Sequence, residues 1–125
     1  NGDRVQAEKY YQDALELTLE IGDKNGTAQD YTYIGNLKFK NGQIDDAEAN
    51  FDKAIDYFKE ANNKPSLLQL FLTVARMELM ISRKDQSGKY LDQAKTMCKE
   101  LGSPEDLVKN IEEIEKISDS VDPNG

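Results

Sequence analysis

Histidine and tryptophan are absent from this chain of 125 residues, and cysteine occurs once, at Cys98. Without histidine the chain lacks the commonest general base, the usual pH switch near neutrality and the commonest imidazole ligand of metals. A single cysteine cannot form an internal disulfide, and zinc sites built from cysteine and histidine need several such ligands. The composition therefore predicts no enzymatic activity, no metal and no cofactor.

Long apolar runs and a surplus of cationic residues are also absent. No segment approaches the roughly 18 consecutive apolar residues that span a bilayer, and no charged-then-apolar leader opens the chain. The 24 acidic residues outnumber the 16 basic ones, for a formal net charge of -8. This surplus disfavours binding to nucleic acid, because that binding requires cations to neutralise phosphates. We therefore expect a soluble cytoplasmic protein with no membrane or nucleic-acid partner.

The chain does contain an internal repeat, in which small and large apolar positions recur in register without a gap. Ala7, Tyr11 and Ala14 recur as Ala47, Phe51 and Ala54, whereas Tyr31, Ile34 and Gly35 recur as Phe71, Val74 and Ala75. Leu91 with Ala94 and Ile111 with Ile114 continue the two series. The period is 40 residues, as from Tyr11 to Phe51. A fixed period between roughly 20 and 50 residues indicates stacked structural repeats.

Apolar residues three and four positions apart predict six helices and no strands. We expect these helices over residues 3–21, 27–41, 45–61, 66–82, 85–101 and 104–118. Asp3 and Gln6 form a capping-box pattern at the first start, and Ser103 before Pro104 is the expected N-cap of the last helix. Gly42 is expected to end the second helix because glycine tolerates positive φ.

Small residues at matching positions predict that the helices pair closely. Gly35 and Ala75 provide the small surface on the first helix of each pair, and the neighbouring gaps are filled by Tyr11, Phe51 and Leu91. The small positions on the second helices are Ala7, Ala14, Ala47, Ala54, Ser87 and Ala94. Cys98 lies late on a second helix and is expected to be a buried packing residue.

In the middle repeat, the first helix carries two large residues and then a small one, and the second helix carries a small, a large and a small residue. The spacing of these six positions is that of a known family. These positions are Tyr31, Ile34, Gly35, Ala47, Phe51 and Ala54, with Gly42 at the turn. The chain thus resembles a tetratricopeptide repeat protein, in the variety with a unit of roughly 40 residues. The resemblance implies an all-α solenoid of stacked antiparallel helix pairs, a right-handed superhelix of about six helices. We expect one domain over residues 1–125, divided into a truncated repeat (2–24), complete repeats (25–64 and 65–102), a capping helix (103–118) and a tail (119–125).

The two ends of the predicted solenoid differ. The first helix matches the second half of a repeat whose first half is missing, and the chain opens with asparagine, so we expect a segment of a longer protein. Glu115 occupies a position that must be small for a further helix to pack closely. The last helix is therefore expected to cap the solenoid.

The resemblance further implies a concave groove, lined by the first helices, that holds an extended peptide or a partner helix. The matching positions are Gln29, Thr32, Tyr33, Asn36, Lys40, Gln69, Leu72, Thr73, Arg76, Met80 and Lys109. Asn36 either pairs with a ligand backbone or is a solvated side chain. Arg76 either holds a carboxylate or phosphate or pairs with Glu112 or Glu113. Thr32 stands where chaperone-binding members carry a lysine, so chaperone-tail binding is not expected.

The sequence therefore predicts a non-catalytic protein–protein interaction module, part of a larger scaffold or regulatory protein. The alternative is the peptide-sensing part of a signalling or transcription regulator whose effector domain lies outside this sequence. A homodimer is a second partner prediction, because the missing half-repeat leaves an apolar face near Tyr10, Leu17 and Ile21 that another copy can cover.

Overall fold

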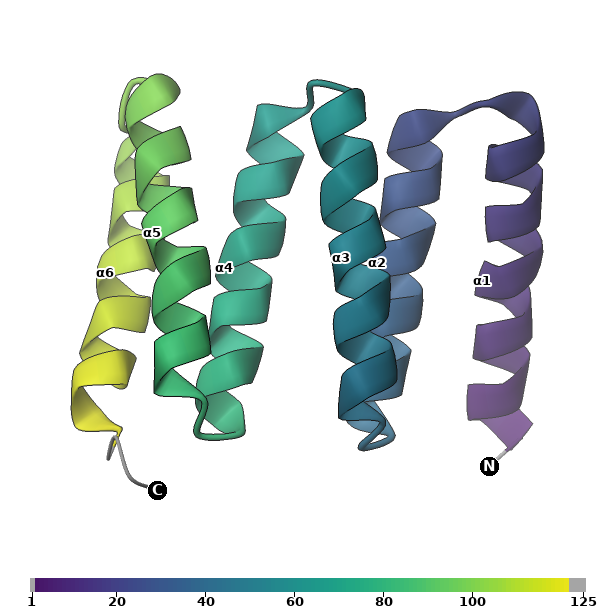
Figure 1. Cartoon of the computed structure of the whole chain (residues 1–125), viewed down its shortest axis with the longest axis horizontal. Helices are drawn as coiled ribbons and strands as arrows, with labels where there is room; N and C mark the ends of the chain where they lie inside the picture. The colour runs from purple at the N-terminus through teal and green to yellow at the C-terminus, as the bar shows by residue number, and fades with distance from the viewer. Residues whose placement is uncertain (1, 122–125) are drawn as a thin grey trace. The chain divides into compact units, whose positions relative to one another are not determined.

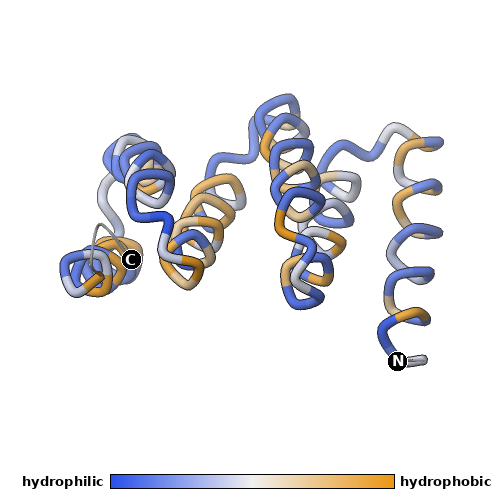
Figure 2. Tube along the Cα trace, turned by 60° about the horizontal axis from the view of Figure 1, so that its bottom comes forward, coloured by the Kyte–Doolittle hydropathy of each residue, from blue (hydrophilic) through white to orange (hydrophobic). Residues whose placement is uncertain are grey.

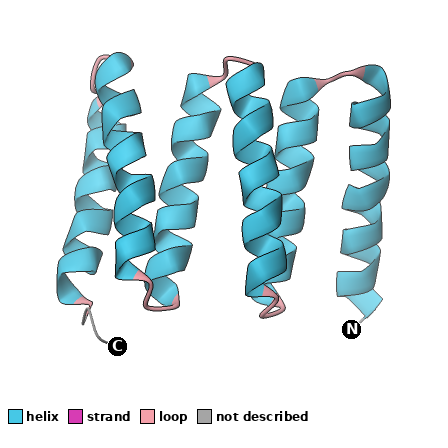
Figure 3. Cartoon of the chain, in the orientation of Figure 1, coloured by secondary structure: helices cyan, strands magenta, loops and turns pink. Residues whose placement is uncertain are grey.

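The computed structural model describes residues 2–121, which form six α-helices and no β-strand (Figure 1, Figure 3). The helices are α1 (Gly2–Ile21), α2 (Lys24–Lys40), α3 (Ile44–Glu60), α4 (Lys64–Met80), α5 (Lys84–Glu100) and α6 (Glu105–Ser120). Short turns join them, so that neighbouring helices run antiparallel within each hairpin. The prediction of an all-α chain of paired helices is confirmed.

The chain divides into two compact units, residues 1–63 and 64–125. In the first unit, α2 packs against both α1 and α3. In the second unit, α4 and α5 pack against each other, and α6 packs against both. Each unit therefore consists of one close helix hairpin, α2–α3 or α4–α5, with one additional helix.

The turns between helices recur at a regular spacing along the chain. In the last turn Ser103 (54°) also has positive φ, but the first such residue of each turn is Gly22 (74°), Gly42 (79°), Asn62 (55°), Ser82 (61°) or Gly102 (86°). The N–H groups of this residue and the next one donate to carbonyls three and five residues earlier. At Ser82, for example, these bonds reach Leu79 at 3.0 Å and, from Arg83, Glu78 at 2.8 Å. This is the Schellman motif, which satisfies the last carbonyls of a helix and ends it at a defined residue.

Ser82 is the least suitable of these turn residues, because its Cβ disfavours the left-handed conformation that glycine adopts freely. We expect Ser82→Gly to raise the free energy of unfolding by about 1 kcal/mol, measured by urea denaturation. The control is Ser118→Gly, which places glycine inside α6 and is expected to lower stability by up to about 1 kcal/mol. Equal stability of Ser82→Gly and the wild type would contradict the strain assigned to this turn.

The start of α2 differs from the sequence prediction. The helix begins at Lys24 and not at Thr27, because Asp23 acts as its N-cap. The Asp23 Oδ1 atom accepts a hydrogen bond of 2.9 Å from the N–H of Gly26, which satisfies one of the free donors of the first turn.

The two terminal helices also differ in detail. Ser103 is not the N-cap of α6, because its φ of +54° places it in the preceding turn, and Pro104 is the cap instead. Asp3 lies within the first turn of α1 and is not its cap, since the helix begins at Gly2. The predicted tail was wrong for residues 119–120, which continue α6, and its residues 122–125 lie outside the described residues.

The core of the first unit depends on the close approach of α2 and α3. Gly35 is buried, and a Cβ atom added there would lie 2.7 Å from Cε1 of Phe51. Ala47 and Ala54 flank Phe51 one turn away on either side and are also buried. The predicted small surface on both helices is therefore confirmed in this hairpin.

The second unit uses the same positions with different residues. Ser87 replaces alanine, is fully buried, and its hydroxyl donates a 2.9 Å hydrogen bond to the carbonyl of Ala75. Figure 2 shows hydrophobic residues along most of α4, and Ile111 and Ile114 of α6 are buried in this unit. Cys98 is a free, buried thiol, as predicted.

Candidate functional site

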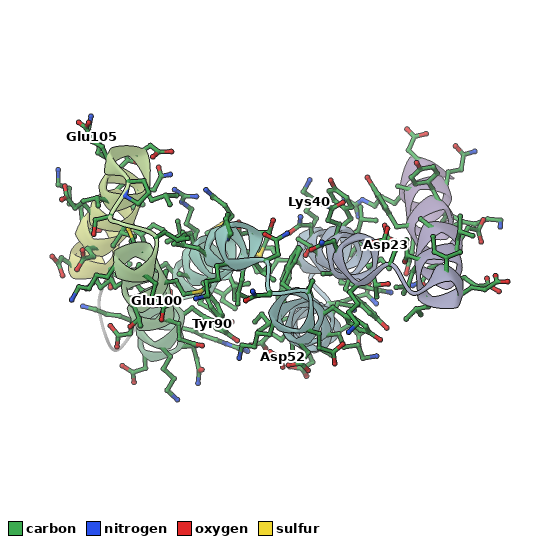
Figure 4. The ribbon with its side chains drawn as sticks, turned by 90° about the horizontal axis from the view of Figure 1, so that it is seen from above. Asp23, Lys40, Asp52, Tyr90, Glu100 and Glu105 are labelled. Atoms are coloured by element: carbon green, nitrogen blue, oxygen red, sulfur yellow. The ribbon has the colours of Figure 1, made fainter. Side chains whose placement is uncertain are left out.

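The five predicted binding residues of α2 lie along one side of the helix, because their spacing of three, one, three and four residues brings them onto one face. They are Gln29, Thr32, Tyr33, Asn36 and Lys40; we call this set the α2 surface. Gln29, Tyr33 and Lys40 are exposed, and Thr32 and Asn36 are half-buried. Lys40 extends from the end of α2 (Figure 4).

Two polar groups of the α2 surface are directed toward the protein. The hydroxyl of Thr32 donates to the carbonyl of Ala28 at 2.9 Å, one helical turn earlier. The Oδ1 atom of Asn36 is inaccessible to solvent and has no hydrogen-bond partner among the described residues. Asn36 must therefore rotate before its amide can both donate to and accept from a ligand, and this rotation would relieve an unsatisfied buried acceptor.

Aromatic rings extend the α2 surface onto α1. Tyr33 is 46% exposed, and its ring stacks on Tyr11 with centroids 4.9 Å apart. Tyr11 in turn meets Tyr10 edge to face at 5.2 Å. The sequence predicted Tyr11 as a packing residue and Tyr10 as part of an open face, but it did not predict that they join Tyr33 in one cluster. Only the juxtaposition of α1 and α2 reveals it.

Polar contacts hold α1 against α2 beside these rings. Lys38 of α2 pairs with Glu8 of α1 at 2.6 Å, with both side chains largely shielded from solvent. Thr18 of α1 donates a 3.0 Å hydrogen bond to Oδ2 of Asp30. Burial raises the pKa of the Asp30 carboxyl; the Thr18 hydrogen bond lowers it, and the nearby charge of Asp23 raises it further. These contacts hold α1 against α2, and so keep Tyr10 and Tyr11 of α1 next to Tyr33 of α2.

The predicted residues of the second unit are less uniform. On α4, Gln69, Arg76 and Met80 are exposed and Thr73 is half-buried, whereas Leu72 is only 1% exposed. Leu72 is therefore part of the core, because α4 buries side chains around most of its circumference. We use the name α4 surface for the other four residues.

The two cations of the second unit that were predicted to bind a ligand differ in whether they form an ion pair. Lys109 of α6 is exposed and pairs with Glu105 at 3.3 Å. Arg76 makes no ion pair with any residue that the structure describes, and so pairs with neither Glu112 nor Glu113. Its guanidinium is therefore available to an anionic group from outside the chain.

A small pocket lies between α5 and α6 and contains none of the predicted residues. Its volume is about 220 Å³, below the range of about 300–1,000 Å³ typical of ligand pockets. The lining residues are Lys95, Cys98, Lys99, Ser103, Val108, Ile111, Glu112 and Glu115. Lys95 and Glu115 pair at 2.7 Å beside it. Because of its small size and its charged rim, this pocket is a weaker candidate for the binding site than the α2 surface.

In the described part of the chain, neither a cluster of metal ligands nor a membrane-spanning helix occurs. Between residues 2 and 121, no three His, Cys, Asp or Glu side chains are placed to hold a metal ion together. None of the helices in that range combines the length and the hydrophobicity needed to cross a membrane.

Comparison with known proteins places this architecture among repeat proteins. Residues 1–60 match the family described as "Tetratricopeptide repeat". The chain is also 36% identical over 62 residues to "Photosystem I assembly protein Ycf3" of Rippkaea orientalis (strain PCC 8801 / RF-1). That alignment covers 49% of this chain and 36% of the relative, so the chain spans about a third of the relative's length. No solved structure matches the chain.

Proposed function

Because residues 1–60 match the tetratricopeptide repeat family, whose repeats generally mediate protein–protein interactions, we propose that the chain is a non-catalytic module that binds an extended peptide or a partner helix. The α2 surface is its main contact region. The observation that carries this proposal is the aromatic cluster of Tyr33, Tyr11 and Tyr10, in which Tyr33 and Tyr10 are exposed. Tyr33 shares α2 with the amide of Asn36 and the cation of Lys40.

The chemistry of the α2 surface fits a peptide better than a small metabolite. Stacked tyrosine rings provide apolar area together with polar tips, a combination enriched at protein interfaces. Gln29 and Asn36 supply amides that pair with peptide N–H and C=O groups. Lys40 adds a positive charge at one end. A peptide with an apolar or aromatic side chain near an acidic residue would meet all three groups.

The α4 surface is proposed as a second contact region within its own unit. Gln69 and Thr73 offer hydrogen-bonding groups, Met80 is 74% exposed, and Arg76 is unpaired among the described residues. A ligand carboxylate, such as the end of a peptide chain, would form a two-pronged bond with Arg76. Lys109 is proposed to contribute charge from α6.

The relative's name supports a more specific role. That protein is described as an assembly protein for photosystem I, and we propose by analogy that this chain holds protein subunits while a larger complex is built. The unpaired charges and exposed rings suit transient contact with such subunits. We also propose a cytoplasmic location, in which the free thiol of Cys98 stays reduced.

Binding is tested by selecting peptides from a random phage-displayed library against the chain. We expect selected peptides to lose at least about 10-fold in affinity, or about 1.4 kcal/mol, with Tyr33→Ala and with Asn36→Ala. Fluorescence anisotropy of one labelled peptide provides the measurement. Helical content should not change, because Tyr33 is exposed and alanine favours helix more than asparagine.

The matched control is Lys59→Ala, which removes an exposed side chain from α3. It should bind the selected peptide as the wild type does. If neither Tyr33→Ala nor Asn36→Ala weakens binding, the α2 surface is not the binding site. Arg76→Ala, tested in parallel, reports separately on the α4 surface.

A further inference from the structure

The small pocket between α5 and α6 has an apolar interior and a charged opening. Two of its lining residues are almost fully buried, Cys98 at 3% and Ile111 at 6% exposed, and a third, Val108, is half-buried. A buried thiol packs as a small apolar group. The four charged residues that line the pocket are exposed or half-buried, so they surround its opening. We call this cavity the α5–α6 pocket.

The charges at this opening are separated by helix. Both cations, Lys95 and Lys99, belong to α5, and both carboxylates, Glu112 and Glu115, belong to α6. The two helices pack against each other and run antiparallel (Figure 1). Because Lys95 pairs with Glu115, Lys99 lies opposite Glu112, one helical turn away. The pocket therefore presents a positive side and a negative side to any molecule that enters it.

The two opposed pairs differ in whether they are joined. The 2.7 Å contact between Lys95 and Glu115 connects α5 to α6 on one side of the opening. Lys99 and Glu112 are both exposed, and neither forms an ion pair with any residue in the described range 2–121. Each directly follows a buried lining residue, Cys98 or Ile111. An open cation–carboxylate pair therefore flanks the apolar interior.

A free apolar amino acid carries the three groups that match this arrangement. Its ammonium, its carboxylate and its apolar side chain all diverge from one carbon atom. The carboxylate can accept a hydrogen bond from Lys99 and the ammonium can donate one to Glu112, while the side chain enters the apolar interior. Inside a peptide the same residue has uncharged backbone groups, which would use neither charge. The opening therefore favours the free amino acid over a peptide.

The volume of the α5–α6 pocket determines which side chain it can hold. A volume of about 220 Å³ is small for a drug-sized ligand, but an apolar cavity of about 150 Å³ already binds benzene. The branched side chain of leucine fits this space. The side chain of alanine would leave most of it empty and would bury little apolar area. Size therefore selects among apolar amino acids, and charge selects amino acids over other apolar molecules.

We propose that the α5–α6 pocket binds a free branched-chain amino acid such as leucine, held by Lys99 and Glu112. The bound amino acid bridges α5 and α6, and so stabilises the packing of these two helices. The site shares no residue with the α2 surface or the α4 surface. Binding of an amino acid and binding of a protein partner are therefore separate properties, and either can fail without the other.

Isothermal titration calorimetry with leucine tests the site. We expect the wild type to bind leucine with a Kd between about 10 µM and 1 mM, and to bind alanine at least about 10-fold more weakly. Lys99→Gln and Glu112→Gln are each expected to weaken leucine binding at least about 10-fold, because each removes a hydrogen bond to a charged group.

The matched controls are Lys89→Gln on α5 and Glu113→Gln on α6, which remove exposed charges that do not line the pocket. Both should bind leucine as the wild type does. Absence of leucine binding by the wild type at concentrations up to about 10 mM, or equal losses in the Glu112 and Glu113 variants, overturns the proposal.

N-acetyl-leucine amide distinguishes a free amino acid from a leucine side chain within a peptide. This compound has the same side chain as leucine but neither charge, so we expect it to bind at least about 10-fold more weakly. Binding as tight as that of leucine would show that the pocket accepts a side chain of a protein partner, and would overturn the proposal.

Filling the pocket tests the location of the site. Val108→Phe is expected to abolish leucine binding without loss of helical content, because Val108 lines the empty volume that the added ring would occupy. Thermal unfolding followed by circular dichroism provides the second measurement. Leucine should raise the unfolding midpoint of the wild type but not that of Val108→Phe. An equal rise in both proteins overturns the assignment to this pocket.

Discussion

Gly35→Ala is expected to lower the free energy of unfolding by about 2 kcal/mol, within the range of about 1–3 kcal/mol measured for overpacked cores. An added methyl group would contact three atoms of the Phe51 ring at 2.7–3.0 Å. Alanine normally favours helix over glycine by about 1 kcal/mol. The substitution therefore loses stability even though it improves local helix propensity, because α2 and α3 cannot separate without exposing their core.

The second hairpin indicates how this loss can be reversed. There Ala75 and Leu91 occupy the positions of Gly35 and Phe51, and both are buried. We expect Gly35→Ala combined with Phe51→Leu to be more stable than the sum of the two single changes predicts, by at least about 1 kcal/mol. Chemical denaturation of the four proteins in this double-mutant cycle measures the coupling. Additive losses would show that the two side chains do not share one space.

Ile114→Ala is expected to have the largest effect, a loss of about 2–4 kcal/mol, because Ile114 is fully buried and its truncation leaves a cavity. The residue lies on α6, which packs against both α4 and α5. The matched control on the same helix is Ile117→Ala, since Ile117 is 48% exposed. We expect it to change stability by less than about 1 kcal/mol.

Thermal and urea unfolding followed by circular dichroism compare the two isoleucine variants. The prediction also tests the place of α6 in the fold. If Ile114→Ala and Ile117→Ala unfold at the same midpoint as the wild type, α6 is not an integral part of the second unit. A large loss for Ile114→Ala alone would show that α6 is an essential third helix of this unit.

Much of the fold could be predicted from the type and the spacing of a few residues. The recurrence of Gly35 as Ala75, and of Phe51 as Leu91, predicted which helices pair closely, because helix packing requires small residues opposite large ones. The turn at Gly42 was also predicted, because glycine tolerates positive φ. Ser82 occupies an equivalent turn with φ of +61°, but serine gives no such indication; only the register does.

The candidate site was harder to predict, because exposure depends on neighbouring helices. Leu72 fits the spacing of a binding residue but is buried, since α4 is apolar on more than one side. The stack of Tyr33 on Tyr11 joins residues of two different helices and depends on how α1 meets α2. The inward direction of the Asn36 amide depends on a side-chain rotation that helical spacing does not determine.

The regular spacing of the turns also affects how fast the chain can fold. Close contacts join residues near in sequence: Ser87 bonds to Ala75 of the preceding helix, and Phe51 likewise meets Gly35 of the helix before its own. Little loop-closure entropy opposes such contacts, so each hairpin can form before any distant segment is in place. Helical proteins with mostly local contacts fold in about microseconds to milliseconds. During synthesis, the hairpin of α2 and α3 can therefore form while α6 is still being made.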